Sequence, residues 1–196
     1  MSNDDDKLSD SEIIRRVIAG DVNAFEPLLT RYQDHVLNIV RKHISQNQIE
    51  ETAQEVFIRA YRGLPTIKKT DHFKQWISAV AVRTCYDFWR KQYRSREIPM
   101  SNLSERHRRW LEDAVSDRSD ALYSESRLRQ EAVELLDWAL DKLSAKDRMV
   151  FELVYLEGLS GKEASDLLGW SVANVKVRSY RCRKKIAELL SDFMSP

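Results

Sequence analysis

The chain has 196 residues, enough for one ordinary domain or two small ones, and its 32 basic and 31 acidic side chains leave a net charge of only +1. Charged residues make up 32% of the chain, and no apolar run approaches the ~18 residues that cross a membrane, so composition excludes a membrane-embedded protein. The acidic start, MSNDDDKLSD, is unlike a secretory signal, and we expect a cytoplasmic protein.

Helical periodicity runs through most of the chain, and with only five glycines and four prolines it predicts an all-α fold. Ser9 and Glu12 have the spacing of a capping box for a first helix, which Gly20 ends. Two more helices follow, and a fourth begins with Asp71 as its expected cap. Together they predict one compact domain over residues 1–96. Its expected core is Phe25, Leu28, Leu29, Tyr32, Val36, Ile39, Val40, Ile49, Ala53, Val56, Phe57, Ala60, Tyr61, Phe73, Trp76, Ile77, Val80, Ala81 and Phe88.

Periodicity lapses after this domain, which predicts a linker over residues 97–126 with a short helix around 108–115. A second small helical domain is expected over residues 127–196. Its helix after Ser144 is expected to run to Gly158, and Ser160 and Glu163 repeat the capping-box spacing for a short helix. Open and closed arrangements of the two domains are both compatible with this pattern.

The last two helices have the spacing of a helix-turn-helix. Ser165 supplies the small residue at the crossing, Gly169 the turn, and Val175 the apolar residue that meets the core. Ser171 is expected to cap the last helix. The second helix of such a unit enters the DNA major groove. Its inward side is predicted to be Val175, Ser179, Cys182, Ile186 and Leu189.

The rest of the last helix is cationic. A solvated surface helix is the alternative interpretation, but no acidic residue between Val172 and Lys185 offers pairing along the helix. Val177 lies within this polar side, where its methyl groups could touch a thymine methyl. We therefore predict duplex DNA binding by Lys176, Val177, Arg178, Arg181, Arg183, Lys184 and Lys185.

A second side of the fourth helix mixes aromatic rings with cations. Such a mixture suits single-stranded DNA, because bases stack on rings while cations follow the backbone, and it can hold a flipped base. Burial of the rings against earlier helices is the alternative. The residues concerned are Arg83, Tyr86, Trp89, Arg90, Lys91, Tyr93 and Arg94.

The remaining reactive side chains point to no chemistry. Cys85 and Cys182 lack metal-ligand spacing and are expected to be reduced core thiols. His35 and His43 share a helix face, and we expect an ordinary surface role rather than a metal site. There is no phosphate loop, nucleophile motif or facing acid pair, so we expect no enzyme activity, metal or cofactor.

Four segments, in this order, resemble the bacterial extracytoplasmic-function (group 4) sigma factors of the sigma-70 family. They are AGDVNAFEPLLTRYQ, AQEVFIRAYRGL, the DHFKQWISAVAV helix, and LSAKDRMVFELVYLEGLSGKEASDLLGWSVANVKVRSYRCRKKI. The resemblance covers about Leu8 to Leu190 and implies sigma regions 2 and 4 without regions 1 and 3. It also implies an alternative sigma factor for a stress or envelope-type regulon, usually held inactive by an anti-sigma protein that wedges between the domains.

The resemblance further implies how the work is divided. Region 2 would dock on the β′ clamp helices of core RNA polymerase and melt the −10 promoter element, and region 4 would read the −35 element and contact the β flap. A solvated face is the alternative for the docking side. Docking residues would be Glu51, Gln54, Glu55, Phe57, Ile58 and Arg62, and −10 residues Phe73, Trp76, Arg83, Tyr86, Trp89, Arg90, Lys91 and Arg94.

Three residues depart from the family pattern. Arg83 stands where many members carry Asn, Trp89 is larger than the usual aliphatic residue, and Ser165 replaces Ala. The first two leave the captured −10 base undefined. Two rival functions remain: a helix-turn-helix regulator that binds an operator as a dimer, and an adaptor that binds only proteins.

Overall fold

The computed structural model describes residues 8–95, 135–136 and 138–194, so the predicted linker and its short helix lie outside the described residues. All regular structure in these ranges is helical, which confirms the all-α prediction. None of the helices in this part of the chain combines the length and apolarity needed to cross a bilayer. The helices are α1 (Asp10–Ile18), α2 (Glu26–His43), α3 (Ile49–Gly63), α4 (Phe73–Ser95), α7 (Ala145–Phe151), α8 (Gly161–Leu168) and α9 (Val172–Met194).

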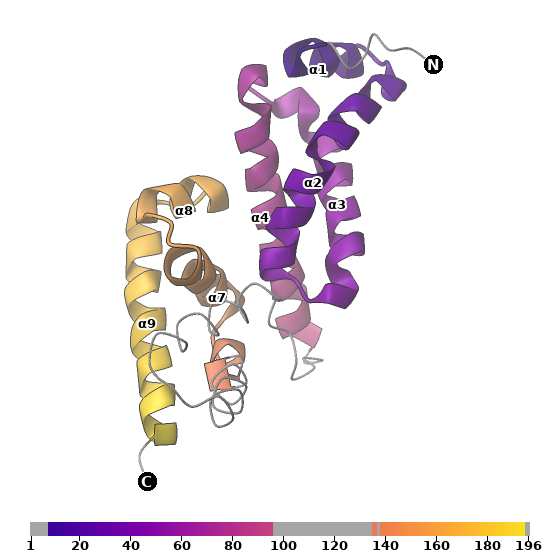
Figure 1. Cartoon of the computed structure of the whole chain (residues 1–196). Helices are drawn as coiled ribbons and strands as arrows, with labels where there is room; N and C mark the ends of the chain where they lie inside the picture. Colours follow the sequence, from indigo (N-terminus) through magenta and orange to yellow (C-terminus); the bar gives the residue numbers. More distant parts are fainter. Residues whose placement is uncertain (1–7, 96–134, 137, 195–196) are drawn as a thin grey trace, which may run out of the picture.

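The first unit is a bundle of α2, α3 and α4, with α1 lying across one end (Figure 1). Ser9 and Glu12 form the predicted capping box of α1. A 3-10 turn, Val22–Phe25, precedes α2 and leaves Pro27 in the first turn, where its missing N–H is harmless. Asp71 does not cap α4 as expected, because it lies in a 3-10 turn and accepts a 2.5 Å hydrogen bond from the Ser11 hydroxyl.

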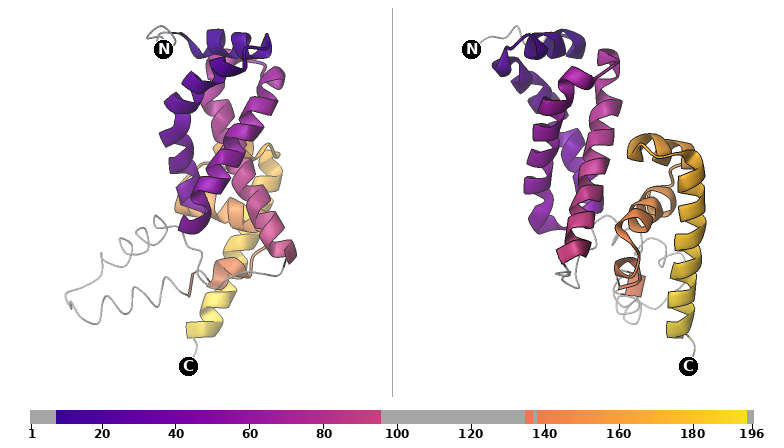
Figure 2. Two further views of the ribbon diagram at one scale, coloured as in Figure 1. Left: turned by 90° about the vertical axis from the view of Figure 1, so that its right-hand side faces the viewer. Right: turned by 180° about the vertical axis from the view of Figure 1, so that it is seen from behind.

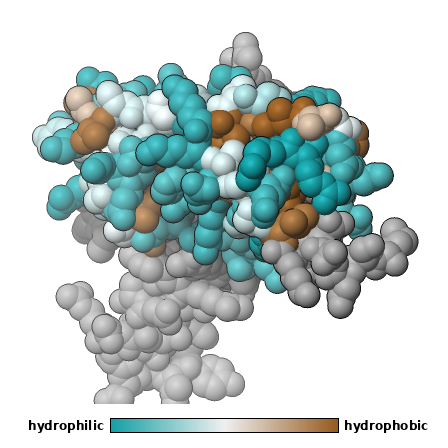
Figure 3. Space-filling model, turned by 90° about the horizontal axis from the view of Figure 1, so that it is seen from above, coloured by the Kyte–Doolittle hydropathy of each residue, from teal (hydrophilic) through white to brown (hydrophobic). Residues whose placement is uncertain are grey.

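The core of the first unit follows the predicted stripes at most positions. Leu28, Val36 and Phe73 are fully buried. Two expectations were wrong: Leu29 is 38% exposed and Tyr61 is 37% exposed. Each lies at the margin of its stripe, where the neighbouring helix no longer covers it. Seen from the α1 end, the surface is mostly hydrophilic with local hydrophobic patches (Figure 3).

The second unit is built from α7, α8, α9 and helical residues 135–136 and 138–141. The expected helix up to Gly158 is interrupted, because α7 ends at Phe151 and continues as a wider π-helical turn, Glu152–Leu156. The inward side of α9 is confirmed, with Val175, Cys182 and Ile186 buried. These pack against α7 and the 138–141 segment.

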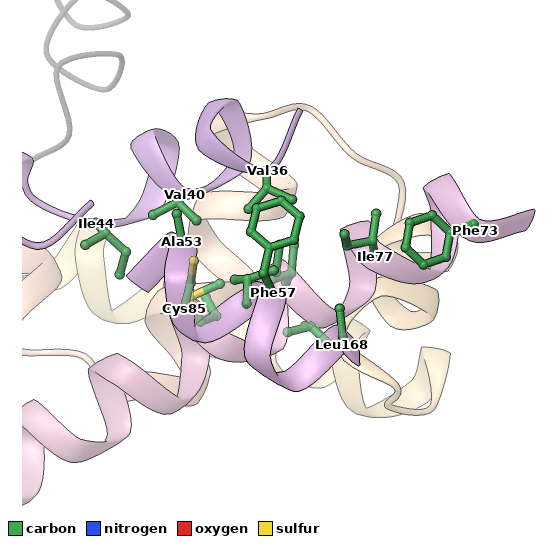
Figure 4. Close-up of a cluster of buried hydrophobic side chains, with 14 of the residues drawn as sticks. Val36, Val40, Ile44, Ala53, Phe57, Phe73, Ile77, Cys85 and Leu168 are labelled. Carbon is green, nitrogen blue, oxygen red and sulfur yellow. The ribbon is translucent and has the colours of Figure 1, made fainter. Parts of the chain in front are cut away.

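The two units are closed against each other. Met149, Leu153 and Leu168 of the second unit belong to the same buried cluster as the α2–α4 core. Leu168, Ile77 and Phe57 are three of the buried side chains of this cluster that Figure 4 shows. Helices α7 and α8 contact α4, so that α9 stands on the far side of the second unit (Figures 1 and 2).

Candidate nucleic-acid interfaces

The turn between α8 and α9 is set by local chemistry. Ser160 and Glu163 form a reciprocal capping box that starts α8. Gly169 ends it in the left-handed region, at φ 72°, and donates its N–H to the Ser165 carbonyl at 2.9 Å. The Ser171 hydroxyl then accepts the N–H of Asn174 and starts α9. The predicted helix-turn-helix is therefore present, with Ser165 buried at the crossing.

The outer face of α9 is open to solvent in the closed fold. Val177 is 48% exposed and stands among the cations. Tyr180, which we had not predicted as a contact, is 70% exposed and lies three residues further on the same face. Its position three residues after Val177 was the available signal. Exposed cations flank the pair: Lys176, Arg181, Arg183, Lys184 and Lys185.

One predicted contact differs from the others. Arg178 donates to Asp147 at 2.8 Å and to Asn174 at 2.9 Å, and its guanidinium stacks over Trp170 at 5.8 Å. It is therefore committed to joining α9 to α7 and to the turn. Lys184 pairs with Glu188 at 3.6 Å, and both side chains are mostly exposed, so its charge stays available.

Two rings predicted for the −10 element are inside the core. Phe73 and Trp89 have no exposed surface, and the Trp89 indole N–H donates to the His43 carbonyl at 3.0 Å. In this arrangement neither ring is accessible to DNA, because both lie on the side of α4 that faces other helices, and their −10 role stays a prediction. Trp76 is half-buried, with its ring against Gly63.

The middle of the aromatic side of α4 is in contact with the second unit. Arg83 donates to the Leu167 carbonyl at 3.1 Å, and Tyr86 packs edge-on against Trp170 with ring centroids 5.5 Å apart. Arg90 and Lys91 remain exposed, and the Arg94 side chain lies outside the described residues.

The outer side of α3 carries the predicted docking residues. Glu51, Gln54, Ile58 and Arg62 are exposed, with Ile58 at 44%. Phe57 is mostly buried but lines a surface groove between α2 and α3, together with Leu29, Leu37, Ile49 and Ile58. Glu55 pairs with Arg59 at 2.7 Å. This amphipathic groove would suit a partner helix.

A buried ion cluster joins the two units, and sequence reasoning missed it. His43 is 2% exposed, so the expected surface role was wrong. Its Nδ1 lies 2.7 Å from Glu152 and its Nε2 lies 3.0 Å from Glu157. Burial of the ring opposes protonation, but the hydrogen bonds and charges of both carboxylates outweigh it and raise the pKa of His43 to about 9.

The Glu157 carboxylate of this cluster is ionised. Burial of Glu157 opposes its charge, yet His43 and Lys42, whose ammonium is 2.7 Å away, lower the Glu157 pKa to about 2. Both cysteines are buried free thiols, as predicted. Burial raises the pKa of the Cys85 thiol well above its ordinary value, so it is unreactive.

Comparison with known proteins supports this geometry. Residues 28–95 match the description "Sigma-70 region 2" and residues 134–186 match "Sigma-70, region 4". The chain is 27% identical over 181 residues to the ECF RNA polymerase sigma-E factor of Escherichia coli K12, covering 92% of this chain and 94% of that protein. It is 25% identical to the same-named factor of Haemophilus influenzae, covering 96% and 99%. The solved complex of CnrH with the cytosolic domain of CnrY shares the fold, at a TM-score of 0.50, 23% identity and coverage of 93% and 97%.

Proposed function

We propose how this chain, which belongs to the sigma-70 family as an extracytoplasmic-function sigma factor, acts in transcription initiation. The first unit docks on the β′ clamp helices of core RNA polymerase and opens the −10 element. The second unit contacts the β flap and reads the −35 element as a duplex. An anti-sigma protein controls the chain, which acts as an initiation factor and not as an enzyme.

The exposed cationic face of α9 is the observation that carries the proposal. It combines five exposed cations with the exposed side chains of Val177 and Tyr180, on the second helix of a helix-turn-helix. Cations neutralise phosphates, and a valine methyl or a tyrosine hydroxyl can contact base edges. A nearly neutral protein gathers this charge on one helix because a polyanion is its partner.

The groove between α2 and α3 supports polymerase docking. Its floor includes Phe57, and its exposed apolar edge is formed by Leu29 and Ile58 beside Gln54. This groove lies on the first unit, and its lining residues belong neither to the turn between α8 and α9 nor to α9. Docking through this groove would hold both DNA-binding units on one platform and raise the effective concentration of each at its promoter element.

Run-off transcription with core RNA polymerase and genomic fragments tests this proposal. We expect specific transcripts only when the chain is added, and weak DNA binding by the chain alone. An Ile58→Glu change should abolish association with core polymerase, while Lys142→Glu, at an exposed site on the second unit, should not.

An operator-binding regulator predicts the reverse result. In that case the purified chain binds a palindromic duplex tightly without polymerase, and the reconstituted enzyme starts no transcripts. That outcome would overturn the proposed function.

A further inference from the structure

The interface between the two units is built around buried charges rather than around apolar contacts alone. Arg148 of α7 is 1% exposed, and its guanidinium lies 3.8 Å from the centre of the Trp89 ring on α4. The same guanidinium binds Glu152 at 2.9 Å and Asp141 at 2.6 Å. The second unit therefore presents an organised cation to an aromatic ring of the first.

In the first unit, the C-terminal end of α2 contacts this surface. His43 places one ring nitrogen on Glu152 and the other on Glu157, and Lys42 also reaches Glu157. With His43 protonated, three cations (Lys42, His43 and Arg148) face three carboxylates (Asp141, Glu152 and Glu157). We call these six residues and Trp89 the clasp.

The clasp specifies one arrangement of the units more than it adds net stability. Withdrawing charges from water nearly offsets their mutual attraction, so a well-paired buried network contributes little net free energy. A shifted arrangement, however, would leave one of these charges buried without its partner, which is strongly unfavourable. In a fully opened chain the charges return to water, and that penalty disappears.

Closing by the clasp occupies part of the single-strand face of α4. Arg83 is held by the Leu167 carbonyl, and Tyr86 by the Trp170 ring. Tyr93 donates its hydroxyl to the Leu140 carbonyl at 3.2 Å. The groove on α2 and α3 and the outer face of α9 remain exposed. The closed chain thus presents its polymerase and duplex surfaces while it engages Arg83, Tyr86 and Tyr93 of its single-strand surface and leaves Arg90 and Lys91 exposed.

We infer that the clasp is an autoinhibitory contact, in which the α7–α8 surface of the second unit acts as an intramolecular ligand for the −10 face of α4. The free chain stays closed, and docking on polymerase separates the units and frees Arg83, Tyr86 and Tyr93. This inference rests on the proposed function for the role of α4, whereas closure itself can be measured without polymerase.

The test compares two histidines of the same helix in the full-length chain. His43→Ala removes both histidine contacts across the interface and leaves Glu152 with Arg148 and Glu157 with Lys42. His35→Ala is the matched control, because His35 pairs at 2.8 Å with Ser78 inside the first unit. Small-angle X-ray scattering of the free proteins reports the separation of the units.

We expect a larger radius of gyration for His43→Ala only. We also expect it to bind a labelled, mixed-sequence single-stranded oligonucleotide about tenfold more tightly, because the competent open state becomes populated. His35→Ala should match the unmodified chain in both measurements. Equal compactness of all three proteins, or opening without a gain in single-strand binding, would overturn the inference.

A second variant keeps the test decisive if His43→Ala does not fold. Glu157→Gln preserves shape and removes one charge at the partly exposed edge of the clasp, and the same two measurements then decide the outcome. Run-off transcription by the unmodified chain separates the two proposals. Absence of transcripts would contradict the proposed function. If the unmodified chain gives normal transcripts but the His43→Ala variant stays as compact as the unmodified chain, only the clasp is contradicted.

Discussion

Helices α9 and α4 both carry cations and aromatic rings on one side. In the closed fold this side of α9 faces solvent, whereas this side of α4 contacts the second unit. On α9, Val177 and Tyr180 stand exposed among exposed cations. On α4, Arg83 and Tyr86 are engaged by the second unit. The same residue types can therefore be a ready contact surface or an internal one, depending on which helix packs over them.

The closed packing of the two units depends most strongly on Arg148, so substitution of Arg148 should have the largest effect on stability. Arg148→Met leaves Glu152 and Asp141 without their buried cation, and we expect a loss of about 3–5 kcal/mol in the free energy of unfolding. Urea unfolding followed by circular dichroism measures this loss. Lys184→Ala, an exposed control, should change the value by less than about 0.5 kcal/mol. Similar losses in both variants would contradict the buried role of Arg148.

A pH profile should show the closed interface directly. The pKa of His43 is raised to about 9 from its ordinary 6.5, so its stabilising contribution is complete below 6.5 and is lost as the pH rises through about 9. The pKa of Glu157 is lowered from 4.5 to about 2, so its contribution is complete above 4.5 and is lost as the pH falls toward about 2. Stability from the clasp is therefore greatest between these limits.

We expect unfolding free energy to fall by on the order of 2 kcal/mol between about pH 6 and about pH 10. His43 faces Glu152 and Glu157 of the second unit. Lys42 also pairs with Glu157, Arg148 pairs with Glu152, and the Cys85 thiol on α4 interacts with both carboxylates. His43→Ala should flatten the profile on the alkaline side. An unchanged alkaline slope in that variant would show that a group other than His43 causes the pH dependence.

A substitution on the exposed face of α9 should change DNA binding without changing the fold. Arg181→Ala should weaken binding of reconstituted enzyme to duplex promoter DNA by about tenfold and reduce the slope of binding against salt by about one phosphate contact. Association with core polymerase should stay the same. Lys142→Ala is the matched cation control. A promoter footprint and salt slope equal to those of the unmodified chain would remove Arg181 from the contact surface.

Two glycines with nearly equal backbone angles offer the finest comparison. Gly158 and Gly169 have φ of 71° and 72°, so alanine at either position should lose about 1 kcal/mol from left-handed strain. A Cβ at Gly158 meets nothing within 4 Å, whereas one at Gly169 lies 2.7 Å from the Arg83 guanidinium. Only Gly169→Ala should therefore displace Arg83 and increase hydrogen exchange in the middle of α4. Equal exchange in both variants would contradict the contact.

Local patterns predicted what local chemistry determines. The capping boxes at Ser9 and Ser160 and the left-handed end of α8 at Gly169 depend on neighbours within a few residues, and all were confirmed. The buried side of α9 followed from its 3.6-residue period. Tyr180 was missed although its position three residues after Val177 places it on the same exposed face of α9.

By itself, the sequence determined the helices, their caps, the family and the concentration of cations on α9, because each depends on residue type and short spacing. Only the tertiary structure decided that Trp89 is internal, that His43 is a buried ion-pair partner, and that Arg83 and Tyr86 of α4 are engaged by the second unit. Those facts depend on contacts between residues about 50 to more than 100 positions apart, such as His43 and Glu152, and a chain pattern carries no information about which distant surface will cover it.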